Sequence, residues 1–226
     1  IRWGIIGCGD VTEVKSGPAF QKVPYSELVA VMRRDSLKAK DYARRHHVPK
    51  WYHDADQLIN DPEVNAIYIA TPPDSHKYYT LKVAEAGKPV YVEKPMARSY
   101  HECQDMISAC EKANVPLFTA YYRRSLPKFL KVKELIDSKI IGEIRSVIKF
   151  HFIPVDHLEP APKNQPWRVL PEISGGGYFV DLACHTLDLL QYFLGSITEA
   201  KGIAANQANL YPAEDIVTAT FKFESG

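Results

Sequence analysis

Short apolar runs alternate with helical patterns through the first half of this 226-residue chain, and this order constrains the fold more than any other feature. Strands followed by amphipathic helices build a parallel sheet that helices cover. Because the runs are apolar almost throughout, they suit strands that are buried on both faces. We therefore predict an α/β fold with a doubly wound parallel sheet, whose strands cover residues 3–7, 28–32, 66–70, 90–92 and 117–120.

The pattern changes after residue 121, where we place a domain boundary. Mostly apolar residues at every second position of 144–152 alternate with polar ones, which predicts a strand with one solvent-exposed face in an antiparallel sheet. The Pro-rich stretch 154–171 is predicted to be an irregular loop. A last strand ends near Phe223 and is followed by a turn signal without a returning strand, so we expect the second domain to be incomplete at its C-terminus.

Composition and charge exclude several classes of function. Apolar residues make up 46% of the chain, enough for a sizeable core, and Lys and Arg together number 28 against 27 for Asp and Glu. Binding to a phosphate backbone or an anionic membrane needs a basic excess, so neither nucleic acid nor membrane is an expected partner. No apolar run approaches the ~20 residues of a bilayer span, and no secretory signal is recognisable. These features predict a soluble, cytoplasmic protein.

The strand at 3–7 leads directly into the sequence G-C-G-D-V-T at 7–12. Gly7 permits a tight turn, and Gly9 has no side chain to keep a pyrophosphate from the backbone amides of the next helix. Thr12 stands where the dinucleotide-binding pattern has Gly or Ala, so we expect slightly wider packing there. Glycines also serve ordinary turns, but the position after the first strand favours a phosphate-binding turn made of Gly7, Cys8, Gly9, Asp10 and Val11.

The second strand ends in Arg33-Arg34-Asp35. A carboxylate at this point accepts hydrogen bonds from the adenosine ribose of NAD, whereas guanidinium groups pair with the 2′-phosphate of NADP. We predict that Arg33, Arg34 and Lys38 bind the cofactor and that NADP(H) is preferred. Two alternatives remain: Asp35 turns inward and binds the ribose of NAD, or the turn is simply a solvated basic segment that opens a helix.

Two further strands end in rigid turns, which at the carboxyl end of a parallel strand border the cofactor crevice. In the first turn, Asp74 is predicted to cap a helix that ends at Gly87. In the second, Glu93-Lys94-Pro95 would be an ordinary surface turn anywhere else, and its place at a strand end favours a site. The candidate residues of the two turns are Ala70, Thr71, Pro72, Pro73, His76, Glu93 and Lys94.

Three glycines at 175–177 precede a helix that carries Asp181, His185 and Asp188. The glycines allow another backbone or a ligand to come close. The three polar residues are four and three positions apart, so they share one helix face. They supply at most three metal ligands, with no matching cluster elsewhere, and we predict no metal. The alternative to a functional site is a core histidine held by Asp181. The four cysteines show no CxxC pair and no metal-finger spacing. Cys103 and Cys110 are predicted to be buried thiols rather than a disulfide or redox pair.

In combination, these motifs resemble the glucose-fructose oxidoreductase and inositol dehydrogenase (Gfo/Idh/MocA) family over essentially the whole chain. The resemblance implies a Rossmann domain at 1–121 and an α/β domain with an open, mainly antiparallel sheet at 122–226. It implies a homo-oligomer, dimer or tetramer, because similar proteins use the sheet face for oligomer contacts. It also implies a catalytic group of Lys94, Asp181 and His185, with Glu93, residues 70–76, Trp167 and Arg168 lining the nicotinamide and the substrate.

The expected activity is hydride transfer between NADP, or NAD, and a carbinol or carbonyl carbon of a sugar, polyol or related small molecule. One alternative is a trans-dihydrodiol dehydrogenase, in which an aromatic pocket would replace most polar contacts. Its aromatic residues would be Tyr121, Tyr122, Phe152 and Trp167. The other alternative is a nucleotide-binding sensor without activity, against which the intact set of Lys94, Asp181 and His185 argues.

Overall fold

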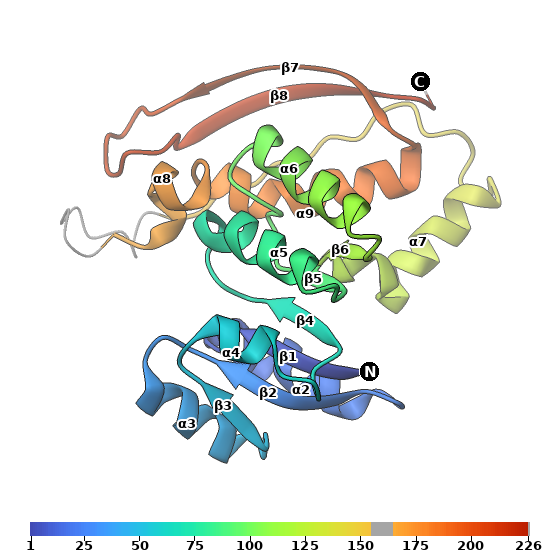
Figure 1. Ribbon diagram of the computed structural model, residues 1–226. Coiled ribbons are helices and arrows are strands. Elements are labelled where there is room, and N and C mark those ends of the chain that lie inside the picture. Colours follow the sequence, from blue (N-terminus) through green and yellow to red (C-terminus); the bar gives the residue numbers. More distant parts are fainter. Residues whose placement is uncertain (155–164, 226) are drawn as a thin grey trace. The chain divides into compact units, whose positions relative to one another are not determined.

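The computed structural model describes residues 1–154 and 165–225. The chain divides into two compact units, Ile1–Ala120 and Tyr121–Gly226. A six-stranded parallel sheet forms the N-terminal unit (Figure 1), with strand order β3-β2-β1-β4-β5-β6. The predicted doubly wound parallel sheet is confirmed. The short strand β3 was not predicted, because it has no apolar run in the sequence. The bounds are β1 Arg2–Ile6, β2 Glu27–Met32, β3 Lys50–Tyr52, β4 Ala66–Ile69, β5 Val90–Val92 and β6 Leu117–Thr119.

The sheet carries an apolar core on each face, because successive residues of a strand point to opposite sides. Ile5 and Tyr68 belong to one core, which α3 completes with Tyr42. Ile6 and Ile69 belong to the other, with side chains from α4, α5 and α6. Helices thus cover both faces. Their bounds are α1 Asp10–Val14, α2 Ser16–Lys22, α3 Ser36–Arg45, α4 Ala55–Ile59, α5 His76–Glu85 and α6 Tyr100–Lys112.

The beginnings of two helices test the capping predictions. The hydroxyl of Ser99 accepts a hydrogen bond from the backbone N–H of Glu102 at 3.3 Å, as predicted for the start of α6. The prediction that Asp74 caps the next helix is wrong. Asp74 lies inside the 3-10 turn η1, Pro73–Ser75, and α5 begins after it. The turn starts early because the fixed φ of a proline suits the first position of a helical turn.

The helix α9, Tyr178–Leu194, contacts most elements of the C-terminal unit. Strands β7, Ile197–Ala205, and β8, Ile216–Phe223, pair antiparallel, which confirms the predicted direction of this sheet. Their register runs from Ile197 opposite Phe223 to Ala205 opposite Ile216. The remaining elements are η2 Tyr122–Ser125, α7 Pro127–Asp137, η3 Trp167–Val169 and α8 Pro171–Ser174.

The predicted strand over 144–152 is wrong, because these residues have no regular secondary structure. No backbone ladder joins them to another strand among the described residues, and a strand needs partners for its N–H and C=O groups. The rings of Phe150 and Phe152 still stack, with centroids 6.3 Å apart, as alternate residues of an extended chain do. Of the predicted loop, residues 155–164 lie outside the described part, and the rest contains η3 and the first residue of α8.

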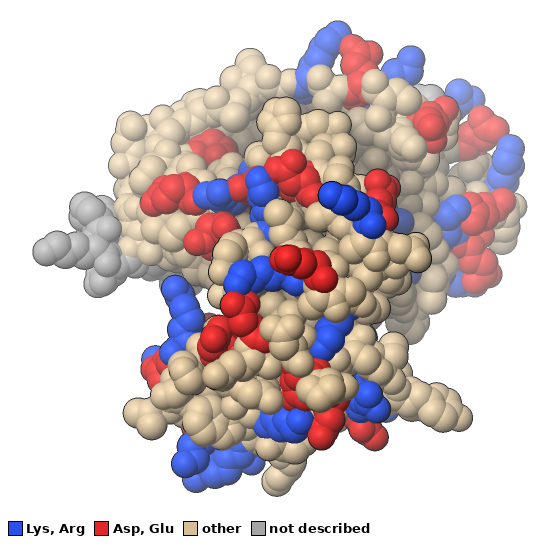
Figure 2. Space-filling model, in the orientation of Figure 1, with Lys and Arg blue, Asp and Glu red and all other residues tan. Residues whose placement is uncertain are grey.

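Charges of both signs are interspersed over the face of the molecule in Figure 2. No helix in residues 1–154 and 165–225 is long and apolar enough to cross a bilayer. All four cysteines are free thiols, of which Cys8 and Cys110 are buried and Cys103 and Cys184 are half-buried.

Glu13 on α1 is held by the end of α3. Both of its carboxylate oxygens accept from the Arg45 guanidinium at 2.7 Å, and the Nε2 atom of His46 lies 2.7 Å from one of them. The Arg45 hydrogen bonds, supported by His46, lower the pKa of Glu13 from 4.5 to about 2. The ion pair between Glu13 and Arg45 therefore links α1 to the end of α3.

We predict that Glu13→Gln lowers the free energy of unfolding at neutral pH by about 1–3 kcal/mol, because the charge-assisted hydrogen bonds are lost. The ionised Glu13 contributes fully above its ordinary pKa of 4.5, and its contribution fades as the pH falls toward the folded value of about 2. Denaturant unfolding of both proteins across that pH range measures the effect.

The difference between variant and wild type should therefore shrink in acid. Glu111→Gln, at an exposed carboxylate on α6, is the control and should change little at any pH. An equal deficit for Glu13→Gln at neutral and acidic pH would contradict the ionic explanation.

Candidate functional site

The turn after β1 approaches the turn after β4 closely. Gly7 has a φ of +89°, which favours glycine. A Cβ atom at Gly7 would lie 2.6 Å from Cγ2 and 3.0 Å from the backbone nitrogen of Thr71. The strand order reverses between β1 and β4, which is where ligands bind in open α/β sheets. Gly9 then precedes α1 as its N-cap residue, and Asp10 and Val11 form the first turn of this helix.

Thr12, which departs from the dinucleotide pattern, is fully buried in the first helix. Its hydroxyl donates to the carbonyl oxygen of Gly9 at 2.8 Å. Its own carbonyl accepts from the hydroxyl of Tyr42 at 2.8 Å. A Cβ atom at Gly17 would lie 2.2 Å from the Thr12 oxygen and 2.3 Å from the Tyr42 oxygen. Glycine at position 17 therefore leaves space for the hydrogen bond between Tyr42 and Thr12. Tyr42 belongs to no sequence motif, so its contact with Thr12 could not be predicted from the sequence.

The basic turn after β2 folds back on the first turn. The Arg33 guanidinium donates to the carbonyl oxygen of Cys8 at 3.2 Å, while Arg34 is exposed. Asp35 caps α3, because its carboxylate accepts from the backbone N–H of Lys38 at 3.1 Å. Burial raises the pKa of the Cys8 thiol to about 11, so this side chain is a neutral packing group.

His76 links the turns that follow β4 and β5. Its Nε2 atom lies 2.7 Å from the Thr71 carbonyl oxygen, and its Nδ1 atom lies 3.1 Å and 3.2 Å from the carbonyl oxygens of Pro95 and Met96. Burial lowers the pKa of His76, although these carbonyls favour its protonated form. The ring has no exposed surface. Ala70, Pro72 and Pro73 complete the first of the two turns.

The turn after β5 holds Glu93 and Lys94, which are both half-buried. One carboxylate oxygen of Glu93 accepts a short hydrogen bond from the hydroxyl of Tyr68, and the other accepts from the backbone N–H of Lys94 at 3.1 Å. The Glu93 backbone N–H donates to the Ile69 carbonyl at 2.9 Å. The peptide bond between Lys94 and Pro95 is cis. The Glu93-Lys94-Pro95 motif predicted a role for Glu93, but nothing in the sequence indicated its hydrogen bond with Tyr68.

A second cluster lies in the C-terminal unit on α9. Asp181, His185 and Asp188 share one buried helix face, as their spacing predicted, with exposures of 4%, 5% and 6%. Asp181 accepts from Arg168 at 3.1 Å, and this guanidinium stacks on the ring of Trp167 at 4.4 Å. The predicted pair of residues 167 and 168 is thus joined to Asp181.

The other neighbours of this helix face come from η2 and the residue before it. Arg124 donates to the Asp188 carboxylate over 2.6–3.0 Å. The rings of Tyr121 and Tyr122 stand edge-on to the His185 imidazole, with centroids 6.0 Å and 5.6 Å away. Both aspartates therefore face arginines, and no group of three His, Cys, Asp or Glu residues suited to a metal ion occurs among the described residues.

The glycine run before α9 accommodates another part of the protein. The N–H of Gly177 donates to the Glu214 carboxylate at 2.8 Å. A Cβ atom at Gly177 would lie 2.5 Å from the Glu214 carbonyl oxygen, and one at Gly176 would lie 2.5 Å from Cγ2 of Val180. The close approach of another backbone, which is one of the two explanations that the sequence allowed, is thus observed at Gly177.

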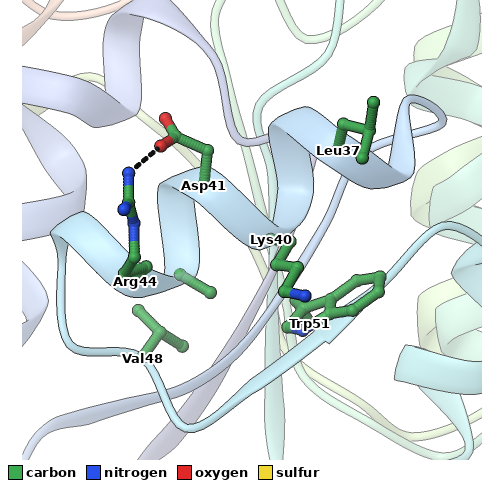
Figure 3. A pocket seen from close by; sticks show the side chains of 7 residues that line it. Leu37, Lys40, Asp41, Arg44, Val48 and Trp51 are labelled. Carbon is green, nitrogen blue, oxygen red and sulfur yellow. Dashed lines mark hydrogen bonds and ion pairs between the residues drawn. The ribbon is translucent and has the colours of Figure 1, made fainter.

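A hollow of about 460 Å³ lies on α3 and β3 (Figure 3). None of the predicted site residues lines it, and its acidic residue Asp41 is paired with Arg44 at 2.8 Å. We therefore do not assign the site to this hollow. Its lining residues are Leu37, Lys40, Asp41, Ala43, Arg44, Val48 and Trp51.

The chain is similar to proteins of known sequence and structure. It is 48% identical over 202 residues to "Oxidoreductase P35" of Formosa agariphila, covering 89% of this chain and 63% of the relative. It is 30% identical to the myo-inositol 2-dehydrogenase of Thermotoga maritima, covering 100% of this chain and 66% of the relative. The chain thus spans about two thirds of the length of these relatives.

Among solved structures, the WlbA dehydrogenase of Bordetella pertussis, in complex with NADH and UDP-GlcNAcA, matches with a TM-score of 0.85 and 27% identity. The match covers 100% of this chain and 64% of that one. Residues 1–121 match the family described as "Oxidoreductase family, NAD-binding Rossmann fold", and residues 129–226 match the GFO/IDH/MocA C-terminal domain. The chain therefore belongs to the Gfo/Idh/MocA family of oxidoreductases.

Proposed function

We propose that this protein transfers a hydride between NAD(P) and a carbinol or carbonyl carbon of a sugar, polyol or related small molecule. The observation that carries the proposal is the buried polar face of α9, where Asp181 and His185 lie. The proposal also gives a catalytic role to Lys94, which follows β5. The myo-inositol 2-dehydrogenase and the WlbA dehydrogenase support the substrate class by similarity.

The first turn fits a dinucleotide. A Cβ atom at Gly9 would meet only the carbonyl oxygen of Gly7, at 3.8 Å, so no described side chain fills the space that this glycine leaves. The pyrophosphate would lie against the turn from Gly7 to Val11. When bound, the nicotinamide supplies or accepts the hydride. Residues 70–73, Glu93, Trp167 and Arg168 would line the nicotinamide and the substrate, and His76 would contribute by holding the turns of residues 71 and 95.

We assign the cofactor preference to NADP(H). The carboxylate of Asp35 already caps α3, and turning it toward a ribose would cost the cap, about 1 kcal/mol. Arg34 is exposed at the end of β2, and Arg33 and Lys38 lie beside it in sequence. Three positive side chains at this point suit the 2′-phosphate of NADP better than the ribose of NAD.

The chemistry requires a proton to move with the hydride, because a carbinol loses its hydroxyl proton as it becomes a carbonyl. Imidazole side chains titrate near neutrality, so His185 is assigned the proton exchange. Lys94 donates to the substrate oxygen and stabilises its negative charge, which is largest in the transition state. Asp181, held by Arg168, orients the imidazole or binds a neighbouring hydroxyl of the substrate.

One observation favours a second candidate. The edges of Tyr121 and Tyr122 beside His185 would suit an aromatic dihydrodiol as well as a sugar ring.

We also propose a homo-oligomer, dimer or tetramer, because apolar side chains of residues 147–153 are exposed.

A screen of sugars, inositols and trans-dihydrodiols with NADP⁺ and NAD⁺, followed by product analysis, tests the activity. Oxidation of a sugar or inositol supports the main proposal, and oxidation of only the dihydrodiols supports the second. Binding of the cofactor without turnover of any compound would favour a nucleotide-binding sensor.

With the substrate found in that screen, Lys94→Ala and His185→Ala should each lower kcat by about 10²–10⁴-fold, because each removes a group that acts on the reacting oxygen or proton. Steady-state kinetics and thermal melting measure activity and folding together. His101→Ala, at an exposed histidine on α6, is the control. Near wild-type turnover by either folded variant refutes the role of that residue.

Arg34→Ala should raise the Kd of NADPH by about tenfold or more and leave that of NADH nearly unchanged, because a charge-assisted hydrogen bond to the 2′-phosphate is lost. Isothermal titration measures both affinities. Lys40→Ala removes an exposed positive charge from α3, the helix that follows Arg34, and should change neither affinity. Wild-type protein that binds NADH as tightly as NADPH contradicts the preference.

A further inference from the structure

Tyr68 connects the turn after β5 to the helices that follow the first turn. Its hydroxyl donates to one carboxylate oxygen of Glu93, and the other oxygen of Glu93 accepts the backbone N–H of Lys94. Ser16, at the junction of α1 and α2, interacts with the same tyrosine hydroxyl and also donates to the Val11 carbonyl at 3.2 Å. A line of polar contacts therefore runs from the first helix to the backbone of Lys94.

The phenol is a rigid donor. Tyr68 has no exposed surface, and its ring packs against those of Phe20 and Tyr91, with centroids 5.3 Å and 5.1 Å away. Burial, together with the neighbouring Glu93 carboxylate, holds the pKa of Tyr68 well above its ordinary value. The hydroxyl therefore keeps its proton near neutral pH and donates a hydrogen bond to Glu93.

Glu93 has little freedom in this arrangement. Both carboxylate oxygens accept hydrogen bonds, and the backbone N–H of the same residue is bound to the Ile69 carbonyl. A carboxylate fixed at both oxygens fixes in turn the direction of the amide that donates to it, which here is the amide of Lys94. Hydrogen bonds to an ionised acceptor are about twice as strong as neutral ones, so the link resists displacement.

We propose that Tyr68 is a positioning residue, which through Glu93 sets the backbone at Lys94 and so the direction in which the lysine side chain leaves the strand end. This inference rests on the proposed hydride transfer, for which Lys94 is a catalytic residue. Tyr68 itself has no exposed surface, so it does not reach the reacting atoms directly.

Tyr68→Phe removes the hydroxyl and keeps the ring in its stack. We expect the amide hydrogen of Lys94 to exchange about tenfold faster, because Glu93 no longer holds it, as NMR-detected hydrogen exchange can measure. With the substrate from the screen, kcat should fall by about tenfold, while the KM for NADP⁺ stays within about twofold of the wild-type value. Loss of packing alone would not produce this separation of kcat from KM.

Tyr91→Phe is the matched control, because Tyr91 belongs to the same aromatic stack and its hydroxyl makes no hydrogen bond among the described residues. It should change neither amide exchange nor kinetics. Glu93→Gln should reproduce the loss of Tyr68→Phe, and combining the two should add little, because both break the same link.

Unchanged Lys94 exchange in Tyr68→Phe would overturn the proposal, and so would equal losses in Tyr68→Phe and Tyr91→Phe. If the wild-type protein turns over none of the screened compounds, the proposed function fails. The amide exchange then still decides whether Tyr68 positions Lys94.

Discussion

The N-terminal unit depends on the close approach of two backbone turns at the carboxyl edge of its sheet. Parallel strands end side by side, so the turns after β1 and β4 compete for the same space. Only a residue without a side chain fits at Gly7 next to Thr71. Two further contacts join the turns at this edge: Arg33 donates to the carbonyl of Cys8, and His76 contacts the turn after β5.

Much of the sheet could be predicted from the sequence, because a buried strand leaves an apolar run of its own. The cap at Ser99 and the shared face of Asp181 and His185 were also predictable, since each depends on residues within two turns of one helix. The predictions failed where the outcome depends on distant partners. The alternating pattern at 144–152 describes a strand only if a neighbour supplies the ladder.

The contacts that the sequence could not reveal are pairs far apart in the chain. Tyr68 and Glu93 are 25 positions apart, and Arg124 and Asp188 are 64 apart. Neither pair has a local spacing rule, because the fold alone brings the two residues together. In the C-terminal unit such pairs compensate buried negative charge, because each buried aspartate of α9 contacts a guanidinium. The edges of the aromatic rings lie beside His185.

The contact between Gly177 and Glu214 has a consequence for how the hairpin can vary. Connections between strands normally tolerate changes of length and sequence. Here Glu214, near the β8 end of the β7–β8 connection, lies against the start of α9. Its carboxylate also interacts favourably with the positive end of the helix dipole. Changes at position 214 should therefore occur together with changes at position 177, because this end of the connection can move only if the helix start moves with it.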